Sequence, residues 1–138
     1  MKQKKTLNIL LVDDTPEILV PTKIIIRHVL KELGHYDVNI DTAENGAAGL
    51  EKISHGSNGS YCLIISDYQM PVMDGLEFYK RLEPEQQRKV IFRTATPQNL
   101  EAELSKLEEP HYKAPAVMSK ASPDIIDDFK QLFLKYLS

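Results

Sequence analysis

The segment LNILLVDD, from Leu7 to Asp14, is a nearly continuous apolar run that ends in two carboxylates. Apolar side chains at successive positions are typical of a strand that is buried on both faces, as in a parallel sheet covered by helices. The abrupt change at Asp13 marks the end of that strand. We therefore expect a buried parallel strand whose carboxyl end carries acidic groups.

Four further short runs along the chain have the character of strands. They are Val38–Thr42, Tyr61–Ser66, Val90–Thr94 and Ala116–Ser119. Only Val38–Thr42 alternates between apolar and polar residues, which is typical of a strand with one exposed face, so we place it at an edge of the sheet. Together with the first run, these segments predict a sheet of five strands.

The strands are separated by segments whose apolar residues recur every three or four positions, as in a helix. The first helix is expected to begin at Pro16 after Thr15 as its N-cap and to stop at Gly34, with Pro21 indicating a kink or a later start. The other helices are expected at Asn45–His55, at Gly75–Leu82, along the stripe Leu100, Leu104 and Leu107, and after residues 122–124. Strands and helices thus alternate, which predicts a doubly wound α/β fold with helices on both faces of a parallel sheet.

The composition indicates one ordinary globular domain. A chain of 138 residues suits a single domain, and 42% hydrophobic with 27% charged residues argues against disorder. The net charge of −3 argues against direct nucleic-acid binding, and the lone Cys62 excludes an internal disulfide and a Cys-based zinc site. Because no segment has the length of a membrane span, we expect a cytoplasmic protein without membrane insertion. We expect residues 1–138 to be one domain, with a core of about 7–136 and no separate effector domain.

Chemically active residues follow four of the apolar runs. Asp13 and Asp14 follow the first, Asp67 the third, Lys120 the fifth, and Thr94 ends the fourth. Ligands of doubly wound sheets bind at the carboxyl ends of strands, where three carboxylates would repel one another and favour a hard cation such as Mg²⁺. An Asp in such a site can accept a phosphoryl group, with a lysine and a hydroxyl stabilising its oxygens. Taken singly, each residue also has a structural role, as a cap, turn, surface charge or β-former.

Four segments resemble the receiver domain of two-component response regulators. They are LNILLVDD (Leu7–Asp14), IISDYQMP with MDG (Ile64–Pro71 and Met73–Gly75), Thr94-Ala95 and Ser119-Lys120. The resemblance covers nearly the whole chain, and the ordered combination is very specific. The expected fold is flavodoxin-like, with strand order 2-1-3-4-5.

The resemblance implies a phosphoacceptor and a set of metal ligands. Asp67 matches the phosphoacceptor, which takes phosphate from a phosphohistidine. Asp13 and Asp14 match the acidic pair that holds Mg²⁺, one directly and the other largely through water. The backbone carbonyl of Gln69 matches the third ligand position of the protein.

The resemblance also locates the residues that bind phosphate and respond to it, with two departures. Thr94 and Ala95 match the switch segment, and Lys120 matches the cation that pairs with phosphate. The family commonly has an aromatic residue three positions before the lysine, but Val117 stands there and cannot gate the surface in the same way. Ala121 replaces the usual proline after the lysine, so we expect a trans peptide between Lys120 and Ala121.

The connection before the last strand, residues 108–115, is a few residues longer than the family usually shows. A surface insertion is the simpler interpretation. The alternative is that His111 and Tyr112 reshape the face formed by the fourth helix, fifth strand and fifth helix for a particular partner. In receivers this face often serves output or dimerisation, and homodimerisation through it is one option here.

The favoured function is a phosphoacceptor that signals by changing its protein-binding surface. The donor would be a histidine kinase or a histidine phosphotransfer protein, the receiver of the signal a downstream protein, and the domain would not turn over an external substrate. One alternative is a degenerate receiver that binds proteins without phosphorylation. A weaker alternative is an Asp-nucleophile phosphatase, but Asp13-Asp14-Thr15 lacks the Asp-x-Asp spacing of haloacid-dehalogenase-type enzymes and the chain is too short for a cap.

Overall fold

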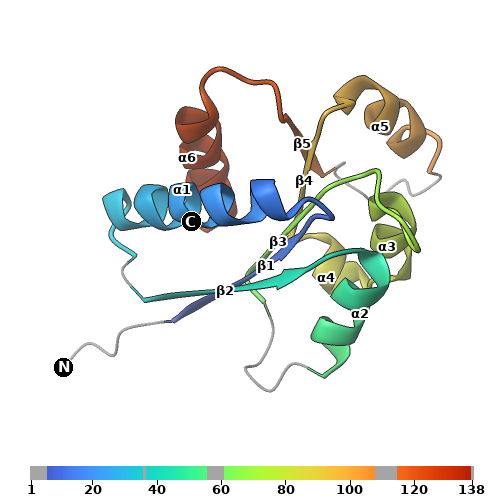
Figure 1. Cartoon of the computed structure of the whole chain (residues 1–138), viewed down its shortest axis with the longest axis horizontal. Helices are drawn as coiled ribbons and strands as arrows, with labels where there is room; N and C mark the ends of the chain where they lie inside the picture. Colours follow the sequence, from blue (N-terminus) through green and yellow to red (C-terminus); the bar gives the residue numbers. More distant parts are fainter. Residues whose placement is uncertain (1–5, 36, 56–60, 108–114, 138) are drawn as a thin grey trace.

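The computed structural model describes residues 6–35, 37–55, 61–107 and 115–137. Its five-stranded sheet is parallel throughout and has the order β2-β1-β3-β4-β5 (Figure 1). The strands are β1 (Leu7–Val12), β2 (Val38–Ala43), β3 (Leu63–Ser66), β4 (Val90–Thr94) and β5 (Ala116–Ser119). The predicted fold, strand order and edge position of the second strand are confirmed.

The helices are α1 (Pro16–Glu32), α2 (Gly46–Ser54), α3 (Gly75–Arg81), α4 (Pro84–Gln87), α5 (Pro97–Leu104) and α6 (Ile125–Tyr136). They cover both faces of the sheet, with α1 packed beside α6 on one face (Figure 1). The other face carries α2, α3 and α5, whose apolar side chains share one core cluster. The sheet is therefore the middle layer of three.

Alternation along β1 explains why the protein has two cores. Leu7, Ile9 and Leu11 pack with α1 and α6, whereas Leu10 and Val12 pack with the helices of the opposite face. All five side chains are nearly inaccessible, since successive residues of a strand point to opposite faces and both faces are covered.

Gly34 ends α1 as the sequence predicts, and the reason is a left-handed turn. Its φ is 93°, and the amide of His35 donates to the carbonyl of Leu30 while the amide of Gly34 donates to that of Lys31. These two bonds form a Schellman motif, which favours glycine at this position. The predicted late start at Pro21 is wrong, because α1 runs without interruption from Pro16 to Glu32.

The short helix α4 was not predicted. Four residues are too few for a periodic apolar stripe, and none of them is buried. Local capping forms the helix instead, because Pro84 occupies the first turn and the Gln86 side chain accepts a hydrogen bond from the amide of Glu83. Several boundaries also differ by one to three residues: Tyr61 and Cys62 precede β3, and Leu107 follows α5. β2 extends to Ala43, α2 is one residue shorter at each end than expected, and α3 ends at Arg81.

Three other expectations concern the peptide bond after Lys120, the connection before β5 and membrane-spanning helices. The described residues contain no cis peptide bond, so the predicted trans peptide between Lys120 and Ala121 is confirmed. His111 and Tyr112 lie outside the described residues. No helix in the described part of the chain is long and apolar enough to cross a lipid bilayer.

Candidate functional site

Three carboxylates meet at the carboxyl ends of β1 and β3. These strands pair in parallel with Val12 opposite Ser66, so the acidic residues that follow them become neighbours. One oxygen from each of Asp13, Asp14 and Asp67 lies within 4.8 Å of the others. Asp13 and Asp67 are buried and Asp14 is exposed. Hard oxygen ligands in this arrangement fit a divalent cation such as Mg²⁺.

Backbone amides orient the two buried carboxylates. Oδ1 of Asp13 accepts a hydrogen bond from the amide of Thr15 at 2.9 Å, and Oδ1 of Asp67 accepts one from the amide of Tyr68 at 2.7 Å. Thr15 is the N-cap residue of α1, as the sequence predicts, but its side chain makes no capping hydrogen bond. Its own amide is satisfied by Asp13. With each Oδ1 engaged locally, the Oδ2 atoms remain for a cation.

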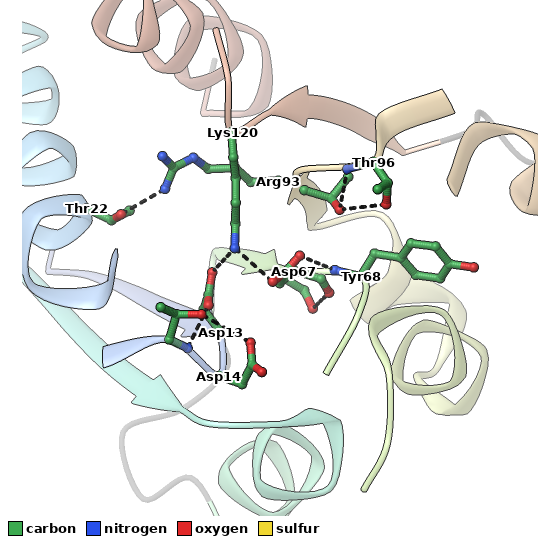
Figure 2. A network of polar contacts seen from close by, with 11 residues as sticks. Asp13, Asp14, Thr22, Asp67, Tyr68, Arg93, Thr96 and Lys120 are labelled. Atoms are coloured by element: carbon green, nitrogen blue, oxygen red, sulfur yellow. Dashed lines mark hydrogen bonds and ion pairs between the residues drawn. The ribbon is translucent and has the colours of Figure 1, made fainter. Parts of the chain in front are cut away.

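Lys120 bridges these Oδ2 atoms from the end of β5. Its Nζ lies 2.8 Å from Oδ2 of Asp13 and 2.8 Å from Oδ2 of Asp67 (Figure 2). The amide of Lys120 donates to the carbonyl of Thr94 at 2.9 Å, which continues the pairing of β5 with β4. The ammonium thus reduces the repulsion between two buried carboxylates.

Burial and charge act on this pair in opposite directions. Burial raises the pKa of Asp67, and the hydrogen bond from Lys120 only partly offsets that effect. Burial also disfavours the ammonium of Lys120, but its hydrogen bonds to Asp13 and Asp67 outweigh burial and raise its pKa. Lys120 therefore stays charged, while Asp67 is a carboxylate that is poorly solvated and gains from a further cation.

Thr94 lies at the end of β4, on the same edge of the sheet. It is 1% exposed, and its Oγ1 accepts a hydrogen bond from the amide of Thr96 at 3.2 Å. Ala95 follows it and is exposed, and Gln69 is exposed in the loop after Asp67. The structure therefore places Thr94 and Ala95 at the predicted edge.

Val117 occupies β5 on the face of the sheet that carries α5. It is partly buried and packs against the second core cluster, as does Tyr68. The consequence of valine at the position where the family commonly has an aromatic residue stays a prediction.

A tight loop after Asp67 holds the site against α3. The amide of Gly75 donates to the carbonyl of Tyr68 at 2.6 Å, and a Cβ at Gly75 would collide with the carbonyl oxygen of Asp67. Asp74 caps α3 by accepting a hydrogen bond from the amide of Glu77 at 2.8 Å. The MDG motif therefore places glycine where a side chain would collide with the backbone of Asp67.

Arg93 is a charged neighbour of the site that the sequence analysis did not single out. It precedes Thr94 in β4, and its Nη1 donates to Oγ1 of Thr22 at 2.8 Å (Figure 2). The signal was present, since an arginine interrupts an otherwise apolar strand, Val90–Thr94.

A family model for the response regulator receiver domain matches residues 9–109, which is most of the chain. The chain belongs to the response regulator receiver family. Receiver domains bind Mg²⁺ at their acidic pocket, interact with histidine kinases or phosphotransfer proteins, and generally act as signalling modules without turnover of an external substrate. The acidic cluster of this receiver domain is compatible with Mg²⁺ binding.

Curated relatives support the same family. The two-component response regulator ORR41 of Oryza sativa subsp. japonica is 38% identical over 79 residues, which are 57% of this chain and 58% of that protein. The response regulator ArlR of Staphylococcus haemolyticus is 34% identical over 88 residues, which are 64% of this chain and 36% of that protein. This receiver domain therefore covers less than two thirds of the length of either relative.

Solved structures agree with the fold. The response regulator TrrA of Thermotoga maritima, in complex with Mg²⁺ and BeF, is 30% identical with a TM-score of 0.65, over 94% of this chain and 98% of that one. The phosphorylated cyanobacterial phytochrome response regulator RcpA is 16% identical with a TM-score of 0.73, over 97% of this chain and 96% of that one. The second likeness concerns the fold alone.

Proposed function

We propose that this receiver domain accepts a phosphoryl group on Asp67 from the phosphohistidine of a histidine kinase or a histidine phosphotransfer protein in the cytoplasm. The observation that carries the proposal is the position of Asp67, buried beside Asp13 and bridged to it by the ammonium of Lys120. This arrangement provides a nucleophile, a cation for the phosphoryl oxygens and acidic ligands for a metal within one small site.

The transfer is a direct displacement at phosphorus. A carboxylate oxygen of Asp67 attacks the phosphorus, the phosphorus–nitrogen bond breaks, and the imidazole leaves with its electron pair. Lys120 then pairs with the phosphoryl oxygens, and Thr94 offers a hydroxyl from the end of β4. Mg²⁺, when bound, supplies positive charge for the phosphoryl oxygens. Asp13, Asp14, Asp67 and the carbonyl of Gln69 would hold it.

The response is a changed surface for a downstream protein. The face formed by α5, β5 and α6 is the proposed output surface, with homodimerisation as one form of the response. Val117 in β5 supports a coupling that differs from one based on an inward-turning aromatic at this position. Direct binding to nucleic acid is not part of this proposal, because the net charge is −3.

Phosphorylation with a small donor tests this function. The protein is incubated with Mg²⁺ and acetyl phosphate or phosphoramidate, and its intact mass is measured, with Asp67→Asn as the control variant. We expect a labile phosphoryl adduct in the wild type that is absent from Asp67→Asn. No adduct with either donor would favour a module that binds proteins without phosphorylation, and turnover of many phosphate esters would favour a phosphatase.

A further inference from the structure

Arg93 places a positive charge between the sheet and the helices that cover it. Residues alternate along β4, so Ile91 and Arg93 point toward the face of α1 and α6. Ile91 is part of the apolar core there, whereas Arg93 introduces a guanidinium at the same face. A charge in this layer requires a compensating environment.

Neutral groups hold the guanidinium. Its Nη1 donates to Oγ1 of Thr22, a residue that is 2% exposed, and its Cζ lies 5.8 Å from the centroid of the Phe129 ring. Nε is buried and has no hydrogen-bond partner. No carboxylate in the described ranges lies within the ion-pair distance of 4.0 Å from Arg93. Local contacts therefore satisfy this charge incompletely.

The acidic cluster lies at the same edge of the sheet as Arg93, which directly precedes Thr94 at the end of β4. Burial lowers the pKa of Arg93, and the charges of Asp13 and Asp67 oppose that effect. An arginine stays protonated under all ordinary conditions, so Arg93 is a fixed positive charge near the site. Figure 2 shows the guanidinium turned toward Thr22, while Lys120 reaches the carboxylates directly.

We propose that Arg93 is a second cation of the phosphoacceptor site, which acts on Asp67 through space while Thr22 and Phe129 hold it away from direct contact. The inference rests on the proposed function, since its consequence is a preference between two charge states of the site. A phosphoryl group raises the negative charge near Asp67 toward about two units, whereas Mg²⁺ adds positive charge. The positive charge of Arg93 accordingly favours binding of the phosphoryl group and disfavours binding of Mg²⁺. Arg93 is thus a positioning residue, which acts on Asp67 through its charge and without contact.

Binding measurements on Arg93→Met and Arg93→Lys test this proposal. Calorimetry gives the affinity for Mg²⁺ alone and then, at saturating Mg²⁺, the affinity for beryllofluoride, an analogue of the phosphoryl group. Arg93→Met should bind Mg²⁺ roughly threefold to tenfold more tightly and beryllofluoride more weakly by a similar factor, as expected for charges that interact without contact in a medium of intermediate polarity. Arg93→Lys keeps the charge and should retain most of both wild-type affinities.

Opposite changes in the two affinities separate an electrostatic role from a structural one. Arg81→Met is the matched control, because Arg81 is exposed on α3 and pairs only weakly with Glu77, at 3.8 Å. It should leave both affinities unchanged. Weaker binding of both ligands by Arg93→Met and Arg93→Lys alike would show a structural role and overturn the inference.

Two outcomes distinguish this inference from the proposed function. A wild type that binds Mg²⁺ and beryllofluoride, together with an Arg93→Met variant of unchanged affinities, overturns the inference alone. A wild type that binds neither beryllofluoride nor a phosphoryl group overturns the proposed function, and the inference with it.

Discussion

Burial works against the ionised form of Asp67, although Lys120 donates a hydrogen bond to it. Burial raises the pKa of this carboxyl above its ordinary value of 3.8, so the folded protein binds the proton more tightly than the unfolded chain. Stability from this group is therefore greatest at low pH and falls as the pH rises through the folded-state pKa. At neutral pH the site keeps a carboxylate that folding alone would disfavour.

Replacement of Asp67 by Asn should accordingly stabilise the metal-free protein. We expect the free energy of unfolding at pH 7 to rise by about 1 kcal/mol, the usual size of the gain when a strained functional group is removed. The gain should shrink as the pH falls through the folded-state pKa, because wild-type Asp67 then becomes protonated. Urea unfolding at several pH values measures this, and a gain that grows on acidification would contradict it.

At the scale of elements, the loop between β3 and α3 controls where Asp67 lies. Gly75 opens α3, and its amide hydrogen bond to Tyr68 brings the loop onto the backbone of Asp67. Val72 in the same loop has a φ of 68° and is 85% exposed, while the amide of Met73 donates to the carbonyl of Pro71 at 2.7 Å. A β-branched residue at positive φ is strained, so the surrounding loop maintains this turn.

Gly75→Ala should displace Asp67 and weaken Mg²⁺ binding at least tenfold, because the added Cβ would collide with a backbone atom that cannot rotate away. Gly34→Ala is the matched control. Its Cβ meets nothing within 4 Å, but its φ is 93°, so it should lose roughly 1 kcal/mol of stability and keep wild-type Mg²⁺ affinity. Calorimetry and urea unfolding of both variants measure these effects. Equal Mg²⁺ affinities of Gly75→Ala and Gly34→Ala would contradict this prediction.

Val72→Asn should stabilise the protein, because asparagine adopts positive φ with less strain than valine. The exposed side chain of Val72 contributes little packing, so the expected gain in the free energy of unfolding is about 0.5–1 kcal/mol. Chemical denaturation provides the measurement. A loss of stability would mean that the Val72 side chain makes a stabilising contact in solution.

At the scale of the whole molecule, strand order brings separate chain segments to one edge. β1 and β3 are adjacent strands, so Asp13 and Asp67 lie side by side. Lys120 reaches both from β5, although 53 positions separate it from Asp67 and more separate it from Asp13. A metal held by Asp13, Asp14 and Asp67 connects the ends of β1 and β3 in the folded state only. Metal binding should therefore stabilise the entire fold.

Mg²⁺ at about 100 times its dissociation constant should raise the free energy of unfolding by roughly 2.7 kcal/mol. Asp14→Asn should reduce this gain, and because Asp14 is exposed the metal-free variant should remain folded. Glu51→Gln, an exposed carboxylate on α2, is the control for a general charge effect. Thermal unfolding with and without Mg²⁺ measures the gain in stability. Equal gains in the wild type, Asp14→Asn and Glu51→Gln would exclude Asp14 as a ligand.

Local patterns predicted most of the elements, since their signals lie within a few adjacent residues. The apolar runs located β1, β4 and β5 correctly, and Gly34 ended α1 where a left-handed turn requires it. α4 was not predicted, because capping bonds form it and it has no apolar stripe. The position of the acidic residues after their strands predicted that they would gather, because all parallel strands end at the same edge.

Contacts through space needed the folded structure. The register of five strands brings Lys120 within 2.8 Å of both Asp13 and Asp67, and the packing of α1 and α6 surrounds Arg93 with Thr22 and Phe129. Neither result follows from spacing along the chain, because distance between side chains depends on how the layers pack. The amino-acid order thus specified the sheet and the residues at its edge, whereas packing determined which charges touch and which act from a distance.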